Sequence, residues 1–217
     1  MMQGMKELQE LAQSLEHGQT QRVAALTQQL LDAGVSPQRI LNEGLIAGMS
    51  LVGEKMRGGE MYLPEVLQSA SAMQASLKIL KPNLAKKGIK PLGKILLGTV
   101  KGDMHDIGKN LVGIMLQGAG FEIIDLGLNV PPQRFVEGID AHHPAIVGMS
   151  AMLTTTMLNM KTIIDTIAAV GLRTKVKIII GGAPVNQKFA DEIGADGYAR
   201  DAVLAVDKVK QLLGLAA

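Results

Sequence analysis

Five short apolar runs alternate with helical patterns between residues 94 and 213, and no other feature of the 217-residue chain restricts its fold as much. The predicted strands are Lys94–Val100, Glu122–Leu126, Ala145–Ser150, Val176–Gly181 and Gly197–Ala199. The predicted helices are Ile107–Gly118, Pro132–His142, Thr154–Val170, Asn186–Ile193 and Ala202–Leu213. Because strands one, three and four are almost wholly apolar, helices should cover both faces of the sheet. The sequence predicts an α/β fold with a Rossmann-like, five-stranded, parallel, doubly wound sheet, most simply in the flavodoxin-like order 2-1-3-4-5.

Residues 1–88 have helical periodicity throughout and predict four helices. The third should begin at Ser36-Pro37 and end at Gly58-Gly59, and the fourth should run from Pro64 to Pro82. Short connections favour an antiparallel four-helix bundle. Gly44 and Gly48, one turn apart, favour close packing of two helices, although a bulky ligand against that face is an alternative.

The periodicity is lost over residues 82–93, where prolines, glycines and lysines gather. Such a composition is typical of an exposed linker between domains. The sequence therefore predicts two domains, a helical bundle at 1–88 and an α/β domain at 89–217.

The composition excludes several kinds of protein. With three Phe, two Tyr, no Trp and a net charge of +2, the chain lacks the aromatic platforms and the basic field of a nucleic-acid binder. No Cys is present, which excludes disulfides, thiolate zinc sites and cysteine nucleophiles. We also find no targeting signal and no apolar run long enough for a membrane span, so we expect a cytoplasmic protein with neither nucleic-acid nor membrane partners.

Candidate functional residues gather where predicted strands one, three and four end. These ends carry Gly98–Gly108, Ser150–Thr156 and Gly181–Pro184. In a doubly wound sheet, ligands bind outside the carboxyl ends of the strands, near the point where strand order reverses. The expected crevice would hold an imidazole, carboxylates, hydroxyls and a glycine pair.

Several ligand sites known on such sheets do not fit the first of these turns. A phosphate loop needs glycines followed by Lys-Ser/Thr, whereas this turn is acidic. The spaced glycines of a dinucleotide site are missing, and Ser150 stands where a phospho-acceptor domain has an aspartate. A Mg²⁺ site at Asp103 and Asp106 is conceivable but lacks a third carboxylate.

Asp103 and His105 can instead form a pair. A metal-bound histidine usually donates its second ring N–H to a carboxylate, which fixes the tautomer. By itself the pair indicates little, because an isolated histidine in a turn is more often solvent-facing or structural.

The spacing of three segments is more specific. Asp103-x-His105-x-x-Gly108 is followed after 41 residues by Ser150-x-Met152, and after 28 more by Gly181-Gly182. This pattern resembles the cobalamin-binding signature Asp-x-His-x-x-Gly, Ser-x-Leu, Gly-Gly in order and separation, with Met152 in place of the usual leucine.

Nearly the whole chain resembles one family. Four N-terminal helices, a linker and a C-terminal cobalamin domain are similar to the corrinoid proteins of methyltransferase systems that serve methanol, methylamines, glycine betaine or aryl methyl ethers, and to the cobalamin module of methionine synthase. The stretch Gly59–Glu65 also looks like the family's bundle sequence. The resemblance implies that 1–88 caps the cobalamin that 89–217 binds.

The resemblance also implies roles for individual residues. Cobalamin would bind base-off and His-on, with His105 as the lower axial ligand of cobalt, Asp103 on its other nitrogen and Ser150 extending a proton relay. Ser150 could instead, or in addition, be the N-cap of the next helix. The implied cofactor-binding residues are Gly102, Asp103, Met104, His105, Asp106, Ile107, Gly108, Ser150, Met152, Leu153, Thr154, Thr155, Gly181, Gly182, Tyr198 and Ala199.

The implied function is that of a methyl carrier. Cob(I)alamin would take a methyl group from a substrate-specific methyltransferase and present methylcob(III)alamin to a second methyltransferase, with a thiol or tetrahydrofolate as acceptor. A reductive activase would be a further partner. Thiol activation usually needs zinc with Cys or His ligands, and besides His105 the chain has only His17, His142 and His143. We therefore expect a non-catalytic or co-catalytic subunit of a multi-component methyltransferase.

Two other functions remain open. A cobalamin-dependent sensor or regulator would usually carry a DNA-binding element, and no basic recognition helix stands out. The cobalamin subunit of an isomerase would leave the helical bundle unexplained. The sequence identifies neither the methyl donor, nor the acceptor, nor the oligomeric state.

Overall fold

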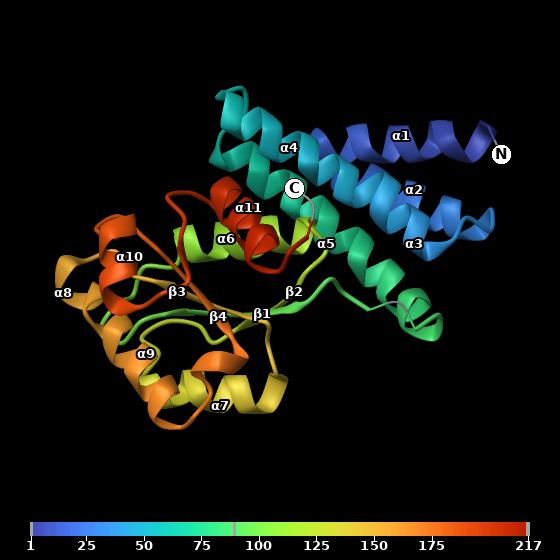
Figure 1. The fold of residues 1–217 in the computed structure, drawn as a ribbon. Coiled ribbons are helices and arrows are strands. Elements are labelled where there is room, and N and C mark those ends of the chain that lie inside the picture. The colour runs from blue at the N-terminus through green and yellow to red at the C-terminus, as the bar shows by residue number, and fades with distance from the viewer. Residues whose placement is uncertain (1, 89, 216–217) are drawn as a thin grey trace. The chain divides into compact units, whose positions relative to one another are not determined.

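The computed structural model describes residues 2–88 and 90–215 and forms two compact units (Figure 1). The first unit contains the residues up to Pro91 and Gly118–Gly120, and the second contains Leu92–Gln117 and the residues from Phe121 onward. The domains 1–88 and 89–217 stay a prediction, and residue 89 of the predicted linker lies outside the described residues.

The first unit is helical, as expected. Its elements are α1 (Met2–Glu16), α2 (Thr20–Asp32), α3 (Pro37–Arg39), the π-helix η1 (Ile40–Ile46), α4 (Ala47–Gly58) and α5 (Leu63–Lys86). The helix α1 packs against α2, η1 and α4, while α2 packs against α5. The buried leucines Leu8, Leu11 and Leu15 of α1 lie in this core.

The predicted start and end of the third helix are confirmed. The Ser36 hydroxyl accepts a hydrogen bond from the Arg39 amide at 3.3 Å, and Pro37 occupies the first turn. Gly59 ends the helix in the left-handed region with φ 75°. The sequence did not foretell that α3, η1 and α4 form one run from Pro37 to Gly58 with a π segment inside it.

The prediction that Pro82 ends the fourth helix is wrong, because α5 continues to Lys86. A proline removes one backbone donor, here the one that would reach the Lys78 carbonyl. Pro82 lies only four residues before the end of a 24-residue helix, so a single lost bond does not stop it. The predicted linker is correspondingly shorter.

The second unit is the predicted parallel sheet in the order β2-β1-β3-β4-β5. Its strands, each within one residue of the predicted bounds, are β1 (Lys94–Thr99), β2 (Glu122–Asp125), β3 (Ile146–Ser150), β4 (Lys177–Gly181) and β5 (Gly197–Tyr198). Thr99 pairs with Ser150, and Ser150 pairs with Gly181. This register brings the carboxyl ends of β1, β3 and β4 to one edge.

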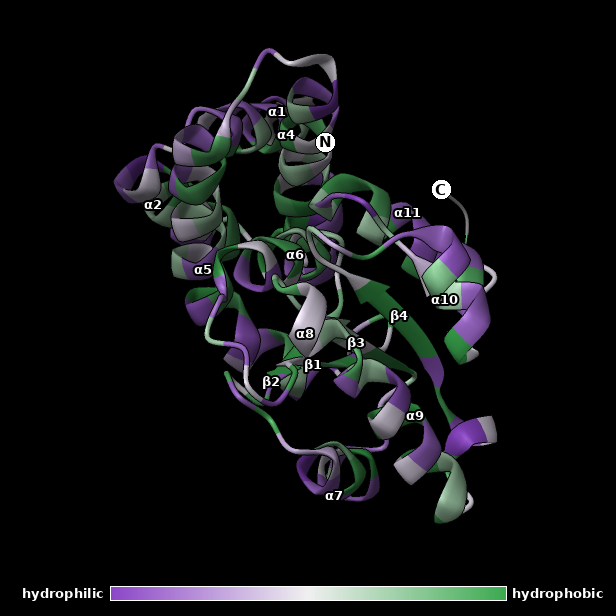
Figure 2. Cartoon of the chain, turned by 90° about the vertical axis from the view of Figure 1, so that its left-hand side faces the viewer, coloured by the Kyte–Doolittle hydropathy of each residue, from purple (hydrophilic) through white to green (hydrophobic). Residues whose placement is uncertain are grey.

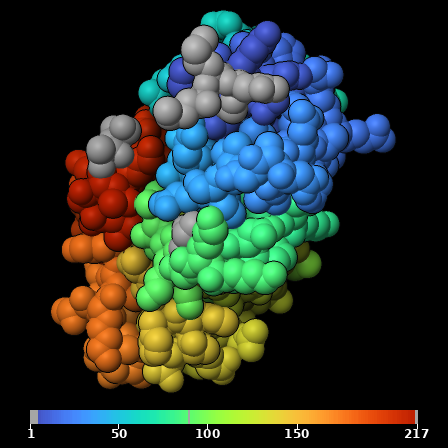
Figure 3. Space-filling view, turned by 90° about the vertical axis from the view of Figure 1, so that its right-hand side faces the viewer, coloured from blue at the N-terminus to red at the C-terminus, as the bar shows by residue number. Residues whose placement is uncertain are grey.

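Helices cover both faces of the sheet, which explains its apolar strands. The helices α6 (Ile107–Gly118) and α11 (Ala202–Leu212) cover one face, while α7 (Pro132–His142) and α9 (Asn159–Ala169) pack together on the other (Figure 1). The short helix α10 (Gln187–Ile193) contacts α9 and β5. Figure 2 shows β4 as largely hydrophobic, and Figure 3 shows α7 (yellow) and α11 (red) at the surface.

The predicted helix Thr154–Val170 is two helices, α8 (Thr154–Met157) and α9, with a break at Leu158. Three threonines begin this segment, and β-branched residues are weak helix formers. The Thr156 hydroxyl also lies 3.0 Å from the Leu153 carbonyl oxygen, so it competes for a backbone acceptor of the first turn. A 3₁₀ turn, η2 (Arg173–Lys175), precedes β4 and was not predicted.

Candidate functional site

A tight turn carries the chain from β1 to the loop that contains Asp103 and His105. The Asp103 amide donates to the Val100 carbonyl at 3.1 Å, and Gly102 has φ 83°. This bond and this φ fit a type II turn, which favours glycine at its third position. The Thr99 hydroxyl donates to the His105 carbonyl at 3.1 Å and ties the far end of the loop to β1.

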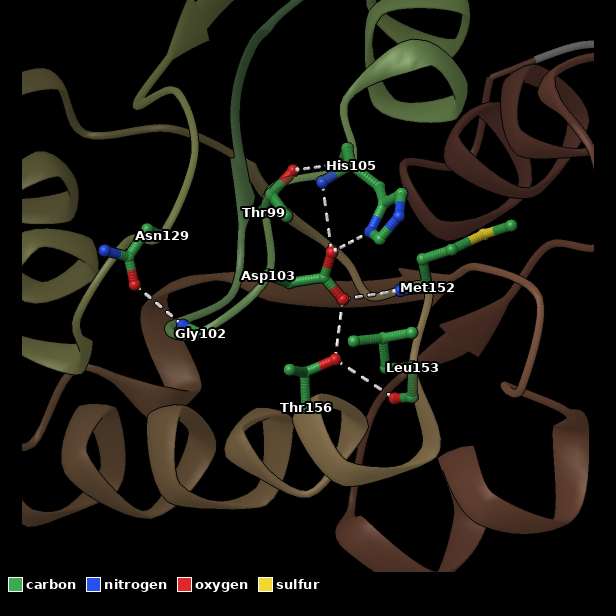
Figure 4. Close-up of polar contacts among 8 residues, drawn as sticks. All are labelled: Thr99, Gly102, Asp103, His105, Asn129, Met152, Leu153 and Thr156. Atoms are coloured by element: carbon green, nitrogen blue, oxygen red, sulfur yellow. Dashed lines mark hydrogen bonds and ion pairs between the residues drawn. The ribbon is translucent and has the colours of Figure 1, made fainter.

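The Asp103 carboxylate is completely buried, and four donors surround it (Figure 4). Its Oδ1 accepts from the His105 amide at 3.1 Å and from the His105 ring nitrogen Nδ1 at 2.8 Å. Its Oδ2 accepts from the Met152 amide at 2.7 Å and from the Thr156 hydroxyl at 2.6 Å. A single carboxylate thus joins the loop after β1 to the loop after β3.

These contacts keep Asp103 ionised. Burial, the largest single influence, would raise the pKa of this carboxyl. The hydrogen bonds from Thr156, Met152 and His105 together outweigh burial and hold the pKa well below its usual value of 3.8. Asp103 is therefore an anion that accepts from the imidazole.

The ionised carboxylate fixes the imidazole of His105. Since Oδ1 can only accept, Nδ1 carries the hydrogen and donates it, which leaves the lone pair of a neutral ring on Nε2. Within residues 2–88 and 90–215, Nε2 has no hydrogen-bond partner, and 56% of the side chain is exposed. His105 thus presents one free nitrogen ligand.

Two exposed apolar side chains lie close to His105 in the sequence, and two more lie in the loop after β3. Met104 and Ile107 flank His105, and Met152 and Leu153 follow β3; all four are exposed. Exposed apolar groups that gather at the ligand-binding edge of a sheet suit a large flat ligand with apolar parts.

The surroundings of the three motif glycines differ, so each position is occupied by glycine for a different structural reason. A Cβ on Gly108 would meet no atom within 4 Å, so the space beside it is open. A Cβ on Gly182, where φ is 125°, would lie 1.8 Å from the Ala151 carbonyl oxygen. On Gly181 it would lie 3.0 Å from the Ala199 carbonyl oxygen. The Gly181-Gly182 pair, which the resemblance implies binds cofactor, therefore allows the backbones after β3, β4 and β5 to approach one another.

The structure gives Ser150 a different place from the predicted one. Its carbonyl oxygen accepts from the Val100 amide at 3.0 Å, but its hydroxyl makes no hydrogen bond to Asp103 in the described part of the chain. It is not an N-cap either, since α8 begins only at Thr154. Thr156 makes the contact expected of Ser150, because its side chain points inward one helical turn beyond the strand.

Sequence reasoning missed Thr156, although a signal existed. Thr156, Met160, Ile163 and Ile167 follow helical spacing on one buried face. A hydroxyl on an apolar face must find a buried partner. Sequence reasoning also missed Asn129, whose side-chain oxygen accepts a hydrogen bond from the Gly102 amide at 2.7 Å.

Of the other predicted residues, Asp106 lies in the loop after β1, Thr154 and Thr155 begin α8, and Tyr198 and Ala199 lie at the end of β5. Asp106 accepts from the Asn110 side chain at 3.0 Å, and Thr154 and Thr155 are exposed. Tyr198 and Ala199 line a cavity of about 280 Å³ together with α11 residues, among them Leu204 and Lys208. Among the described residues, no group of three or more His, Asp or Glu side chains could hold a metal ion. One imidazole suits a cobalt that a macrocycle already holds.

Family models and relatives agree on the class of protein. A model described as a B12 binding domain matches residues 93–207, and a second with the same description matches residues 7–81. A corrinoid protein of Desulfitobacterium hafniense (strain Y51) is 43% identical over 213 residues, which are 97% of this chain and 99% of that one. The trimethylamine corrinoid protein of Methanosarcina barkeri is 44% identical over 187 residues, 85% of this chain and 86% of that one.

A solved structure agrees as well. The methanol:cobalamin methyltransferase complex MtaBC of Methanosarcina barkeri contains a chain that superposes with a TM-score of 0.88 at 28% identity, covering 98% of this chain and 81% of that one. The family models, the relatives and the fold thus define a cobalamin-binding protein. The chain belongs to the corrinoid proteins of methylamine and methanol methyltransferase systems. None of the helices in the described residues is both long and apolar enough to span a membrane.

Proposed function

We propose that this corrinoid protein carries methyl groups between two enzymes. It would receive the group from a substrate-specific methyltransferase and deliver it to a second methyltransferase that methylates a thiol or tetrahydrofolate. The bound corrinoid supplies the chemistry, since its reduced cobalt accepts a methyl group and later releases it. The names of the trimethylamine relative and of the methanol complex support a methylamine or methanol as the methyl source.

One observation carries the assignment of residues: the half-exposed His105 has Nδ1 on a buried carboxylate and Nε2 free. We assign Nε2 as the lower axial ligand of cobalt in a base-off, His-on cofactor. Asp103 would hold the tautomer that exposes this lone pair. Thr156 would hold Asp103, in the role that the sequence suggested for Ser150.

The Asp103–His105 pair also determines which ring nitrogen of His105 can exchange a proton. Because Nδ1 already donates to the ionised Asp103, Nε2 is the ring atom of His105 that could exchange a proton when it is not a ligand. The Thr156 and Met152 donors keep Asp103 ionised throughout. Ligand release and proton uptake would therefore occur on one imidazole, at one atom.

The remaining residues would form the surface against which the cofactor lies. Met104, Ile107, Met152 and Leu153 offer apolar surface beside His105. Gly108 leaves open space at the start of α6 for the descending nucleotide tail. A reductive activase, which would restore reduced cobalt, completes the proposed set of partners.

The absorption spectrum of the reconstituted protein tests the assignment. Wild type should bind cobalamin and show histidine coordination. His105→Ala should lose that spectrum, and its affinity should fall at least tenfold. His142→Ala is the matched control, because this exposed histidine belongs to the same unit and ends α7, away from the carboxyl ends of the strands. A wild-type protein that stays colourless, or a His105→Ala spectrum identical to wild type, would refute the proposal.

A further inference from the structure

Asn129 makes two hydrogen bonds to the turn that carries Asp103. Its side-chain Oδ1 accepts from the Gly102 amide at 2.7 Å (Figure 4). Its own amide donates to the Asp103 carbonyl at 3.1 Å. It therefore contacts the Lys101–Gly102 peptide through the Gly102 amide and the Asp103–Met104 peptide through the Asp103 carbonyl, one on each side of the Gly102–Asp103 peptide.

The backbone of Asn129 is held in an uncommon conformation for this purpose. Its φ is 52°, and it is one of two residues other than glycine with positive φ in the described ranges 2–88 and 90–215. Asparagine enters the left-handed region more readily than most residues. This conformation lets the amide and the side chain of one residue reach the two peptides that flank the Gly102–Asp103 peptide.

The segment that presents Asn129 is fixed along β1. The Thr99 amide donates to the Gly127 carbonyl at 3.0 Å, and the Val130 amide donates to the Thr99 carbonyl at 2.9 Å. The buried Lys109 ammonium donates to Asp125 Oδ2 at 2.5 Å, while the Gly127 amide donates to Asp125 Oδ1 at 2.9 Å. Because both sides of Asn129 are anchored, it can impose a position on the turn.

We infer that Asn129 is a positioning residue that sets the Asp103–His105 pair for ligation, a role that rests on the proposed function of His105. Asp103 receives donors from the Met152 and Thr156 side, and Asn129 holds its backbone from the other side. If Asn129 no longer fixed the Lys101–Gly102 and Asp103–Met104 peptides, the carboxylate would lose its alignment with the ring of His105.

Asn159 provides a matched control. Its side-chain Nδ2 donates to the Lys101 carbonyl at 2.8 Å, on the same peptide as the Gly102 amide, so it holds that peptide from its other side without contacting the Asp103 carbonyl. A general loosening of the turn would follow from loss of either asparagine. Loss of alignment at Asp103 would follow mainly from loss of Asn129, because this residue holds both that peptide and the Asp103 carbonyl.

Four variants test the inference. Asn129→Gly keeps the left-handed backbone and loses the acceptor, Asn129→Asp keeps an acceptor, Asn129→Ala loses both features, and Asn159→Ala is the control. We expect the equilibrium constant for histidine coordination, measured by absorption on bound cobalamin, to fall about three- to tenfold in Asn129→Gly and further in Asn129→Ala. Asn129→Asp and Asn159→Ala should stay within about twofold of wild type.

A second measurement uses the protein without cofactor. Hydrogen exchange at the Gly102 amide should accelerate about fivefold in Asn129→Gly and not in Asn129→Asp, because this amide loses its acceptor only in the former. Wild-type coordination in Asn129→Gly, or an equal loss in Asn159→Ala, would overturn the inference. Failure of the proposed function is distinguishable, since wild type itself would then lack histidine coordination.

Discussion

The carboxylate of Asp103 combines complete burial with four hydrogen-bond donors. An amide at this position would place a donor against a donor, because Asn has only one acceptor oxygen. We expect Asp103→Asn to destabilise the cofactor-free protein by about 1–3 kcal/mol at pH 7.

The loss should depend on pH with a definite sign. The pKa of Asp103 is lowered in the folded protein, so its stabilisation is complete above the unfolded value near 4 and is lost as the pH falls further. The difference in free energy of unfolding between wild type and Asp103→Asn should therefore shrink below about pH 4. Urea denaturation between pH 3 and pH 7 measures this difference, and a constant difference would contradict the prediction.

The sequence identified Asp103, His105 and the glycine pair, because their spacing matches a known signature. Helical spacing with Met160, Ile163 and Ile167 could single out Thr156 as the buried threonine, but it could not identify Asp103, 53 residues away, as the partner of its hydroxyl. Asn129 lies far along the chain from Gly102, and only the register of the segment after β2 brings them together. Whether these residues bind cofactor as proposed stays a prediction.

The helix α1 packs closely on the run from Pro37 to Gly58 at two glycines. A Cβ on Gly48 would lie 2.8 Å from the Ala12 carbonyl oxygen, and one on Gly44 would lie 2.6 Å from the Leu11 Cδ2. The first neighbour is rigid backbone, whereas the second is the end of a flexible side chain. The predicted close packing of helices at both glycines is confirmed.

The two alanine variants should therefore differ. Each gains about 1 kcal/mol of helix propensity. In Gly44→Ala, movement of Leu11 should leave stability within about 1 kcal/mol of wild type. In Gly48→Ala, α1 must shift, and we expect a net loss of about 1–3 kcal/mol. Thermal and urea denaturation of both variants measure the difference in their stabilities. Equal stabilities would contradict the prediction, because they would mean that α1 shifts at no greater cost than the Leu11 side chain.

Element type and order were predictable from periodicity, whereas interruptions were not. Every strand lies within one residue of its predicted bounds. The break at Leu158 depends on the contacts of the Thr156 side chain. The continuation of α5 beyond Pro82 depends on the length of the helix before and after this proline. Such effects arise from tertiary contacts and helix length, which local patterns do not report.

The chain as a whole consists of two compact units, and both match models described as B12 binding domains. We propose that the helical unit caps the cofactor and must move for each partner enzyme, with the linker predicted within residues 82–93 allowing the movement. The relative movement of the units, rather than cofactor affinity, would then limit methyl transfer.

A disulfide that ties the two units together tests this idea. The chain has no Cys, so a cysteine introduced into each unit forms a unique pair. We expect the oxidised variant to retain cobalamin and to lose at least tenfold in methyl transfer from a methanol- or methylamine-specific methyltransferase, with recovery after reduction. Each single-cysteine variant is the control, and undiminished transfer in the oxidised protein would contradict the capping role.

The π segment Ile40–Ile46 also bears on how this helix tolerates changes in length. A π turn closes its hydrogen bonds one residue later than an α turn and so accommodates one extra residue. Removing an exposed residue such as Asn42 could restore a regular α-helix and leave the flanking faces in phase. In α5 the same deletion would rotate everything beyond it by about 100°. Natural relatives that differ by one residue in their helical unit should therefore gain or lose it between Ile40 and Ile46.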